Sequence, residues 1–493
     1  MATQLEHCEI APPNGKVTEL TLPLTFFDIP WLYFHPIQRL LFYEFPCSKA
    51  YFMDTIIPSL KESLSLTLKH YIPLAGNILC PLSGEKPVLR FVFQDSVPLI
   101  IAESNEDFNN LTANYARDAD QFHPFVPELP PPKEEAQFKI IRAFCLQVTL
   151  FPDHGLCLGF TNHHAIGDAS SIVGFIKAWA SISKLAGDSQ LIEAKSLPCF
   201  DRSVVKDPRG IADMYWNQMK NFKFLSSSLH LPTNKVRATY ILHQTDIQKL
   251  KDSLLARKPG LVHPSSFVVT IAYVWTCLVK SGHGNGEKVD PDESEYFSFA
   301  VDCRARMNPP VPANYFGNCI GGAIVIKKHQ ELIEKDGFFN AAESIAEMIR
   351  IKVNNKDEMM KGAENWLREF GDLVGKRLLS VAGSPKFDLY DADYGWGRPK
   401  KLEAVSIDGE DSISLCKSRD SEGGLEIGLS LPRTKMDAFA ALFSSGLGFY
   451  QMKFSTPINT TAFFGFNNPY NLLSEFLHCD VQYCLFNWSL FLF

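Results

Sequence analysis

Residues 155–187 constrain the fold most, because a strand pattern passes there directly into a helix pattern. GLCLGFTN at 155–162 alternates apolar residues with smaller or polar ones, which is typical of a half-buried strand. HHAIGD follows, and the next segment has the apolar face of a helix, made by Ile172, Phe175, Ile176 and Trp179. Asp168 stands at the expected N-cap. The two histidines are therefore predicted at a strand-to-helix turn, where side chains can face a cleft.

Helix and strand patterns alternate irregularly elsewhere, which favours a mixed α/β class. The patterns predict helices over 58–71 and 265–281, a strand over 297–307, and two strands around a Gly-Gly turn within 411–431. Between about 193 and 233 the pattern weakens into polar, proline-containing sequence. A chain of 493 residues has room for two or three domains. We therefore predict an N-terminal domain over 1–192, a crossover over 193–233 and a C-terminal domain over 234–447.

Composition excludes several classes of protein. A formal net charge of −7 argues against a nucleic-acid binder, which usually carries a basic face. The twelve cysteines show no C-x-x-C pair and no zinc-ligand spacing, as expected for reduced thiols in the cytosol. The N-terminus lacks an apolar stretch behind a basic start, and no run of about 18 apolar residues occurs. We expect a soluble, cytoplasmic protein without a metal or a membrane partner.

His164 and Asp168 form the only H-x-x-x-D pair in the chain. Histidine suits proton transfer because its ordinary pKa lies near neutrality. Composition alone would produce roughly one such spacing, so the pair by itself equally fits an N-capping aspartate beside two solvent-facing histidines. The sequence offers no G-x-S-x-G nucleophile, and only Cys8 and Cys479 adjoin a histidine.

Two motifs lie in a fixed order, HHAIGD at 163–168 and DYGWG at 393–397. With them the sequence resembles the plant BAHD acyltransferases, whose hallmarks are H-x-x-x-D and D-F-G-W-G. The resemblance extends over about residues 5–447 and includes three further strings: LKHYIPLAG (68–76), DRSVVKDP (201–208) and FVVTIAYVW (267–275). Tyr394 replaces the usual phenylalanine, and Ala169 stands where many relatives carry glycine.

The resemblance implies two similar-sized mixed α/β domains of the chloramphenicol-acetyltransferase type. A solvent channel would run between them, with acyl-CoA entering from one face and the acceptor from the other. His164 would be the general base near the middle of the channel, acting in a ternary complex. Asp168 would turn away from the channel and pair with an arginine, for which Arg304 is the best match. This pair would shape the site rather than relay protons.

The resemblance also assigns the DYGWG loop to the CoA side of the channel. Asp393, Tyr394, Gly395 and Gly397 would support the cofactor there, since two glycines allow a tight backbone path. Trp396 would either donate its indole N–H to the developing oxyanion or simply pack. Both interpretations of Trp396 stay open.

YFGNC at 315–319 resembles a subgroup that acylates sugars on flavonoids and phenolic glucosides, most often with malonyl-CoA. The malonyl carboxylate calls for a cation, preferably a guanidinium. Arg304, Arg306 and Arg398 adjoin family motifs and are the candidates. Two alternatives remain: a hydroxycinnamoyl-CoA-dependent acyltransferase on similar glucosides, and a non-catalytic relative that binds CoA or a phenolic ligand. We expect acyl-CoA as a cosubstrate, no permanently bound cofactor, and a monomer.

The last 45 residues differ from the rest of the chain. Residues 449–493 hold three charged side chains against thirteen aromatic ones, without a period of two or 3.6. Such a composition resembles translated non-coding sequence. The alternative is a membrane-surface anchor, against which stands the lack of a cationic face. We predict that residues 448–493 are not part of the catalytic fold.

Overall fold

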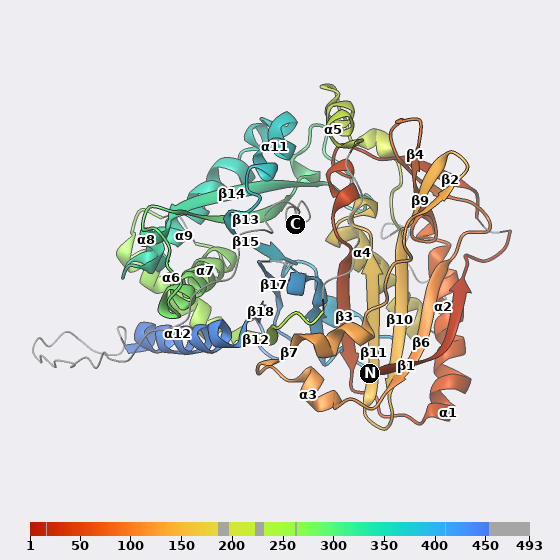
Figure 1. Ribbon diagram of the computed structural model, residues 1–493, viewed down its shortest axis with the longest axis horizontal. Coiled ribbons are helices and arrows are strands. Elements are labelled where there is room, and N and C mark those ends of the chain that lie inside the picture. Colours follow the sequence, from red (N-terminus) through yellow and green to blue (C-terminus); the bar gives the residue numbers. More distant parts are fainter. Residues whose placement is uncertain (16, 186–196, 222–230, 262–263, 410, 453–493) are drawn as a thin grey trace, which may run out of the picture.

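The computed structural model describes residues 1–452, except 16, 186–196, 222–230, 262–263 and 410 (Figure 1). Three sheets organise this part of the chain. The first sheet has the order β1-β6-β10-β11-β3-β16, the second β14-β13-β15-β17-β18-β12-β7 and the third β2-β5-β4-β9-β8. In Figure 1 the first and third sheets stand in the right half, and helices α6 to α9 lie in the left half around the second sheet. Most of the predicted tail, 453–493, lies outside the described residues.

The strands have the following bounds. The first sheet contains β1 (Ala2–Ile10), β6 (Val97–Ser104), β10 (Phe144–Phe151), β11 (Gly155–Asn162), β3 (Ile37–Tyr43) and β16 (Lys401–Ala404). The second contains β14 (Ile320–Lys328), β13 (Ser294–Asp302), β15 (Arg377–Ala382), β17 (Ser412–Lys417), β18 (Leu425–Leu431), β12 (Val236–Leu242) and β7 (Arg117–Asp118). The third contains β2 (Leu20–Pro23), β5 (Val88–Phe91), β4 (Asn77–Pro81), β9 (Phe138–Arg142) and β8 (Lys133–Glu135).

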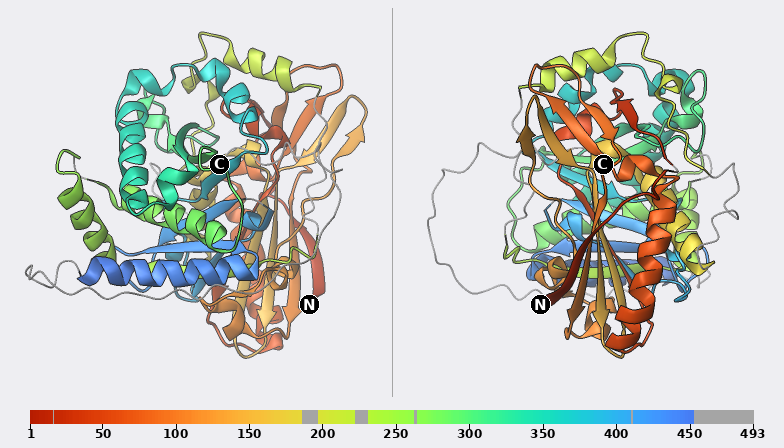
Figure 2. Two further views of the ribbon diagram at one scale, coloured as in Figure 1. Left: turned by 60° about the vertical axis from the view of Figure 1, so that its left-hand side comes forward. Right: turned by 90° about the vertical axis from the view of Figure 1, so that its right-hand side faces the viewer.

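The α-helices cover these sheets. They are α1 (Lys49–Tyr51), α2 (Ile57–Leu68), α3 (Phe108–Thr112), α4 (Ala169–Lys184), α5 (Ile211–Met219), α6 (Gln244–Arg257), α7 (Ser266–Gly284), α8 (His329–Ile333), α9 (Gly337–Met348), α10 (Lys356–Met359), α11 (Trp366–Gly371) and α12 (Arg433–Met452). Figure 2 shows α2 running alongside the strands of the first sheet, in the right-hand view, and α12 lying along α7 at the edge of the molecule, in the left-hand view. None of the helices in the described ranges is long and apolar enough to cross a membrane.

The inner strands of the first sheet are buried on both faces, with side chains that point alternately to opposite sides. On β3, Leu41 and Tyr43 belong to the main core, which also contains the apolar faces of α2 and α4. Leu40 and Phe42 point the other way, into a second cluster with Phe108 of α3. The half-buried pattern predicted for 155–162 is therefore wrong, because every residue of β11 is buried.

Several predicted elements are confirmed and others need correction. The predicted strand at 155–162 is β11, and the pair within 411–431 is the antiparallel pair β17 and β18. The predicted helix over 58–71 is wrong in its bounds, because helical structure begins at Lys49 and ends at Leu68. The predicted strand over 297–307 is also too long. It ends at Asp302, and Arg304–Arg306 form a 3-10 turn.

Each large sheet contains one strand from the other half of the chain. β7 pairs with β12 in the second sheet through Arg117 and Arg237, and β16 pairs with β3 in the first sheet. The segment before the crossover therefore reaches into the second sheet, and a late segment returns to the first. This exchange holds the two large sheets side by side, with space between them.

Candidate active site

A cavity of about 280 Å³ lies between the two large sheets. Its first wall comes from β3, β11 and β16, and its second from β13, β15 and β17. The start of α4 closes one side through Ala169, Ile172 and Val173. Such a cavity is the usual place for a small-molecule site, and the polar groups on its wall define its chemistry.

His164 lines this cavity and His163 does not. β11 ends at Asn162, and the chain then forms the 3-10 turn η5 (His164–Ile166) before α4 begins. His163 caps that turn, since its Nδ1 accepts a hydrogen bond of 3.3 Å from the Ala165 N–H. The turn therefore holds His163 inward for structure and leaves His164 on the cavity wall.

The ring of His164 lies flat against Trp31, with ring centroids 3.7 Å apart and planes 9° from parallel. Phe34 meets the same ring edge-on at 5.7 Å. The His164 side chain is only 7 % exposed, and this burial lowers its pKa to about 3. Burial also lowers the pKa of His163 to about 4. Imidazole is therefore neutral at ordinary pH, the form that can accept a proton.

Asp168 caps α4 and forms the ion pair with Arg304 that the sequence predicted. Its Oδ1 accepts from the backbone N–H groups of Ser170 and Ser171 at 3.1 and 3.3 Å. The Arg304 guanidinium donates to both carboxylate oxygens, at 2.8 and 3.0 Å. Both side chains are buried, at 3 % and 4 % exposure. A two-pronged pair of this kind fixes the start of α4 against the second sheet.

Arg304 is further occupied by backbone oxygens, because its Nη2 donates to the carbonyls of Tyr315 and Gly317 at 3.1 Å each. Arg306 donates instead to the carbonyls of Val353 and Asp302, and Arg398 donates to the carbonyl of Tyr390. Neither Arg306 nor Arg398 lines the cavity. Of the three predicted arginines, only Arg304 touches it.

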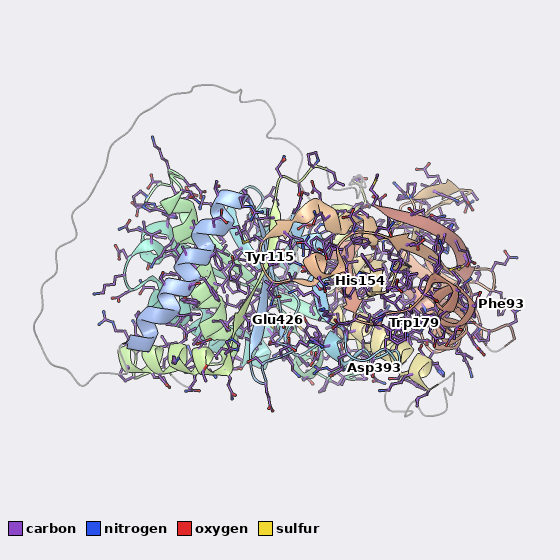
Figure 3. The ribbon with its side chains drawn as sticks, turned by 90° about the horizontal axis from the view of Figure 1, so that it is seen from below. Phe93, Tyr115, His154, Trp179, Asp393 and Glu426 are labelled. Atoms are coloured by element: carbon purple, nitrogen blue, oxygen red, sulfur yellow. The ribbon has the colours of Figure 1, made fainter. Side chains whose placement is uncertain are left out.

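The DYGWG loop packs beside α4, and none of its residues lines the cavity. Asp393 accepts from the backbone N–H groups of Gly395 and Gly397 at 2.9 and 2.8 Å, and from Lys184 of α4 at 2.6 Å. Both glycines have φ values, +94° and +84°, that favour glycine. In Figure 3 Asp393 lies near Trp179, which contacts the next loop residue, Tyr394, edge-on at 5.0 Å.

Trp396 packs away from His164. Its ring stacks with Tyr394 at 5.1 Å and meets Tyr43 edge-on at 5.2 Å. The packing interpretation of Trp396 therefore fits this geometry, and the interpretation as an oxyanion donor has no contact to support it. The loop acts on the cavity through the first sheet, because Tyr43 belongs to β3, a strand of the cavity wall.

Sequence reasoning missed several residues of the site. Trp31 covers the His164 ring, yet its string FFDIPWLYF carries no motif. Arg39 and Lys386 are the other cationic side chains on the described cavity wall. Arg39 donates to Ser406 at 2.8 Å and to the Gln38 carbonyl at 2.9 Å, and Lys386 pairs with Asp302 at 2.8 Å. Only the position of Arg39 on a strand facing the histidine strand could have drawn attention to it.

A buried group of charges supports the wall where β16 meets the second sheet. Glu403 of β16 lines the cavity and receives Arg117 at 2.9 Å and Arg237 at 3.2 Å. Arg237 also pairs with Asp408, which His123 approaches to 3.0 Å. The adjacent guanidinium groups lower the pKa of Glu403 to about 2, against the cost of its burial. The exchanged strands β7 and β16 are thus tied together by charge.

Metal chemistry has no evident site here, since no group of three or more His, Cys, Asp or Glu side chains is gathered for a metal ion in the described ranges. A neutral histidine on the wall of a cavity between two sheets instead fits direct proton transfer between small molecules. This places the protein in the class of two-domain α/β proteins that hold a small-molecule cavity between their sheets.

Comparison with known proteins agrees with this class. A model of the Transferase family matches residues 3–445. The chain is 49 % identical over 451 residues to malonyl-coenzyme:anthocyanin 5-O-glucoside-6'''-O-malonyltransferase of Salvia splendens, covering 90 % of this chain and 95 % of that one. It is also 49 % identical over 454 residues to phenolic glucoside malonyltransferase 1 of Nicotiana tabacum, covering 91 % and 100 %. The crystal structure of vinorine synthase superposes with a TM-score of 0.66 at 20 % identity, covering 90 % and 98 %.

The chain belongs to this family, the plant-type BAHD acyltransferases, and is a CoA-dependent acyltransferase. The resemblance seen in HHAIGD and DYGWG is thereby confirmed. The predicted class of two mixed α/β domains is confirmed as well, by the fold shared with vinorine synthase.

Proposed function

We propose that this chain transfers a malonyl group from malonyl-CoA to a sugar hydroxyl of a flavonoid or phenolic glucoside, with His164 as the general base. The observation that carries the proposal is the neutral, buried His164 ring on the wall of the cavity between the two sheets. The two relatives at 49 % identity, each described as a glucoside malonyltransferase, support the choice of donor and acceptor.

In the proposed reaction the acceptor hydroxyl gives its proton to His164 as its oxygen attacks the thioester carbonyl. The carbon–sulfur bond then breaks, and the CoA thiolate takes the proton from the imidazolium ring. No covalent acyl-enzyme forms, which fits the cavity because Cys416, the only cysteine on its wall among the described residues, has a pKa raised by burial and is not activated. Asp168 serves structure here, since Arg304 and backbone groups occupy its carboxylate.

Arg39 is the cation that we assign to the malonyl carboxylate. Arg304 is committed to Asp168, Lys386 pairs with Asp302, and Arg306 and Arg398 lie off the cavity wall. Arg39 lies on β3 directly opposite Phe160 of β11, two residues before Asn162, and both β11 residues line the same cavity as His164. A guanidinium there can bind the free carboxylate while the thioester faces His164.

A second hollow of about 30 Å³ lies beside Trp31. Its wall includes Phe27, Trp31, Trp366 and Phe370, and it shares Phe299, Ala300 and Ile320 with the cavity. Its volume is enough for only about one or two water molecules, so the phenolic ring of the acceptor would have to lie in the larger cavity beside His164.

The test is acyl transfer by the purified protein with malonyl-, acetyl- and coumaroyl-CoA, each offered with a phenolic glucoside and followed by thiol release and product mass. Malonyl-CoA should give the highest kcat/KM. Use of coumaroyl-CoA without malonyl-CoA would support the hydroxycinnamoyl alternative. Absence of thiol release with every donor would support the non-catalytic alternative.

The Arg39→Gln variant tests the donor assignment. Loss of one charge-assisted contact costs about 1.5–3 kcal/mol, so kcat/KM for malonyl-CoA should fall about 10- to 150-fold. Activity with acetyl-CoA should change much less, because acetyl has no carboxylate. Arg398→Gln, an exposed arginine off the cavity wall, is the matched control and should keep the malonyl preference. An equal loss with both donors for Arg39→Gln would refute the assignment.

A further inference from the structure

The YFGNC string does not line the cavity, although sequence reasoning associates it with the subgroup's donors. None of residues 315–319 belongs to the wall, and the first wall residue after it is Ile320. Asn318 is fully buried, at 0 % exposure, and Tyr315 is 1 % exposed. Its effect on the reaction must therefore pass through the residues that it contacts.

Those contacts surround the His164 turn. Asn318 donates from Nδ2 to the His164 carbonyl oxygen at 2.9 Å. Gly317 donates its N–H to Ser171 Oγ at 3.0 Å and accepts from the same hydroxyl at 3.1 Å. The Cys319 N–H donates to Asp168 at 3.1 Å. Residues 317–319 therefore hold the backbone from His164 to the first turn of α4 in place through hydrogen bonds.

Asp28 connects residues 317–319 to the turn that carries Trp31, whose ring covers His164. Its Oδ1 accepts from the backbone N–H and the Nδ2 of Asn318, at 2.9 and 3.1 Å. Its Oδ2 accepts from the N–H and hydroxyl of Thr25, at 2.9 and 2.7 Å. Asp28 immediately precedes η1 (Ile29–Tyr33), the turn that carries Trp31. One fully buried carboxylate thus fixes both the Trp31 turn and the amide that contacts His164.

Arg202, from the DRSVVKDP string, supplies the positive charge near this carboxylate. Its Nη1 lies 3.9 Å from Asp28 Oδ2. The same nitrogen donates to the Tyr315 hydroxyl at 2.5 Å and to the Phe316 carbonyl at 2.8 Å. The space is filled closely, because a Cβ added at Gly317 would collide with the Arg202 guanidinium. The φ of +145° at Gly317 also favours glycine at this position.

The His164 ring needs such support because its own nitrogen is held only weakly. Within the described part of the chain, His164 Nδ1 makes no hydrogen bond of good geometry, although the Asn318 side chain and the His164 backbone lie close enough to raise the pKa of the ring. In a Ser-His-Asp triad a carboxylate orients the imidazole through that nitrogen. Here the ring is fixed by stacking on Trp31 and by the bond from Asn318 to its backbone carbonyl.

We propose that Asp28 and Asn318 are positioning residues, which together hold the His164 ring against Trp31 in the orientation for proton transfer. The inference rests on the proposed function of His164. According to this proposal, YFGNC fixes the position of the general base His164 and does not select the acyl donor. Arg202 and Tyr315 act behind this pair, by compensating the buried charge of Asp28.

Release of the ring should raise the pKa of His164, because burial under Trp31 is what keeps it low. At pH 5.5 a ring with the ordinary pKa of about 6.5 is only roughly 10 % neutral. Several titratable and charged groups surround the ring. His163 directly precedes the turn that carries His164, and Asp28 and His35 lie before and after η1. The ion pair of Asp168 and Arg304 lies at the start of α4. None of these is removed by a substitution at Asn318. Loss of the Asn318 side chain itself acts in the other direction, because its hydrogen bonding raises the pKa of His164, but this effect is smaller than that of burial, which lowers it.

The experiment compares wild type with Asn318→Ala, which deletes the side-chain donor and keeps the backbone bond to Asp28. Asn314→Ala is the matched control, since Asn314 lies four positions earlier, is exposed, and donates its side-chain amide to the Leu197 carbonyl, away from the His164 turn. Asn318→Ser, which leaves a smaller void, is used if the alanine variant does not fold. The readouts are kcat and KM from pH 5 to 8, and carbethoxylation of His164 located by peptide fragmentation over the same range.

For Asn318→Ala we expect kcat to fall about 10²-fold, as for a small displacement of a reacting group, with the KM for acyl-CoA within about twofold. In acid, both kcat and the rate of His164 carbethoxylation fall as the ring becomes protonated. The pH at which each falls should move toward 6.5 in Asn318→Ala, while Asn314→Ala should follow wild type. A variant that loses activity or stability without moving either limb would overturn the proposal. Carbethoxylation reports the protonation of His164 without any acyl transfer. An inactive wild type would therefore refute the proposed function, while the modification data would still test whether Asn318 positions the His164 ring.

Discussion

Removing the charge of Glu403 should loosen the junction that holds the two large sheets together. Glu403 belongs to β16, the strand that a late part of the chain contributes to the first sheet. Its carboxylate receives Arg117 from β7 and Arg237 from β12, so it ties the exchanged strands to the second sheet. The substitution Glu403→Gln keeps the shape and removes the charge.

The magnitude follows from the pKa of Glu403, which the two guanidinium groups lower from 4.5 to about 2. A depressed carboxylate pKa contributes stability that is present above the unfolded-state pKa and is lost as pH falls through the folded-state pKa. The shift corresponds to a contribution of about 3 kcal/mol to the free energy of unfolding at pH 7. At pH 3.5, where the carboxylate is partly protonated in the unfolded chain, the same contribution is about 2 kcal/mol. Glu403→Gln should therefore be less stable than wild type by about 3 kcal/mol at neutral pH, with a smaller difference in acid.

Urea denaturation of wild type and variant at several pH values measures this difference, with tryptophan fluorescence as the probe. Glu44→Gln is the control, because Glu44 also pairs with a lysine near β16 but is 61 % exposed. That surface pair should contribute less than about 1 kcal/mol. The argument would be refuted if the Glu403→Gln variant were as stable as wild type at pH 7. It would also be refuted if the difference in the free energy of unfolding between the two proteins grew as the pH fell.

Three further outcomes are expected. His164→Ala should keep the fold and lose about 10² to 10⁴ in acyl-transfer rate, and His163→Ala, whose ring lies off the cavity wall, should lose much less in the same assay. Asp168→Ala should lower both the melting temperature and the rate, because it leaves Arg304 buried without its partner at a cost of about 3–5 kcal/mol. A chain ending after Met452, where α12 ends, should match the full chain in solubility and kcat; loss of activity would mean that residues 453–493 support the catalytic fold.

The local part of the site could be predicted from sequence, because short-range rules decide it. Alternation over 155–162 gives β11, the helical period gives α4, and an aspartate before an apolar helix face gives the N-cap. The pair between Asp168 and Arg304 required the family resemblance, since 136 residues separate its members. The resemblance implied that Asp168 pairs with an arginine, and Arg304 was the best match.

The rest depends on contacts that no spacing encodes. Asp28 meets Asn318 across 290 residues, and β16 joins a strand more than 350 positions earlier. Arg306 and Arg398 adjoin family motifs and Arg39 does not, yet of these three only Arg39 lies on a strand of the cavity wall. Whether a charged side chain serves a ligand or a neighbouring backbone carbonyl is decided by the packing of distant elements.

The two family strings that sequence reasoning treated as markers, YFGNC and DYGWG, share one physical property: both pack behind the cavity wall. DYGWG contacts β3 through Tyr43, and YFGNC contacts the His164 turn through Asn318. Residues that touch the substrates can vary with the donor and the acceptor, whereas residues that hold the general base in place must satisfy many buried hydrogen bonds at once. The strings that identify the family would then report how the base is held, and the choice of substrate would be set by less conspicuous wall residues such as Arg39.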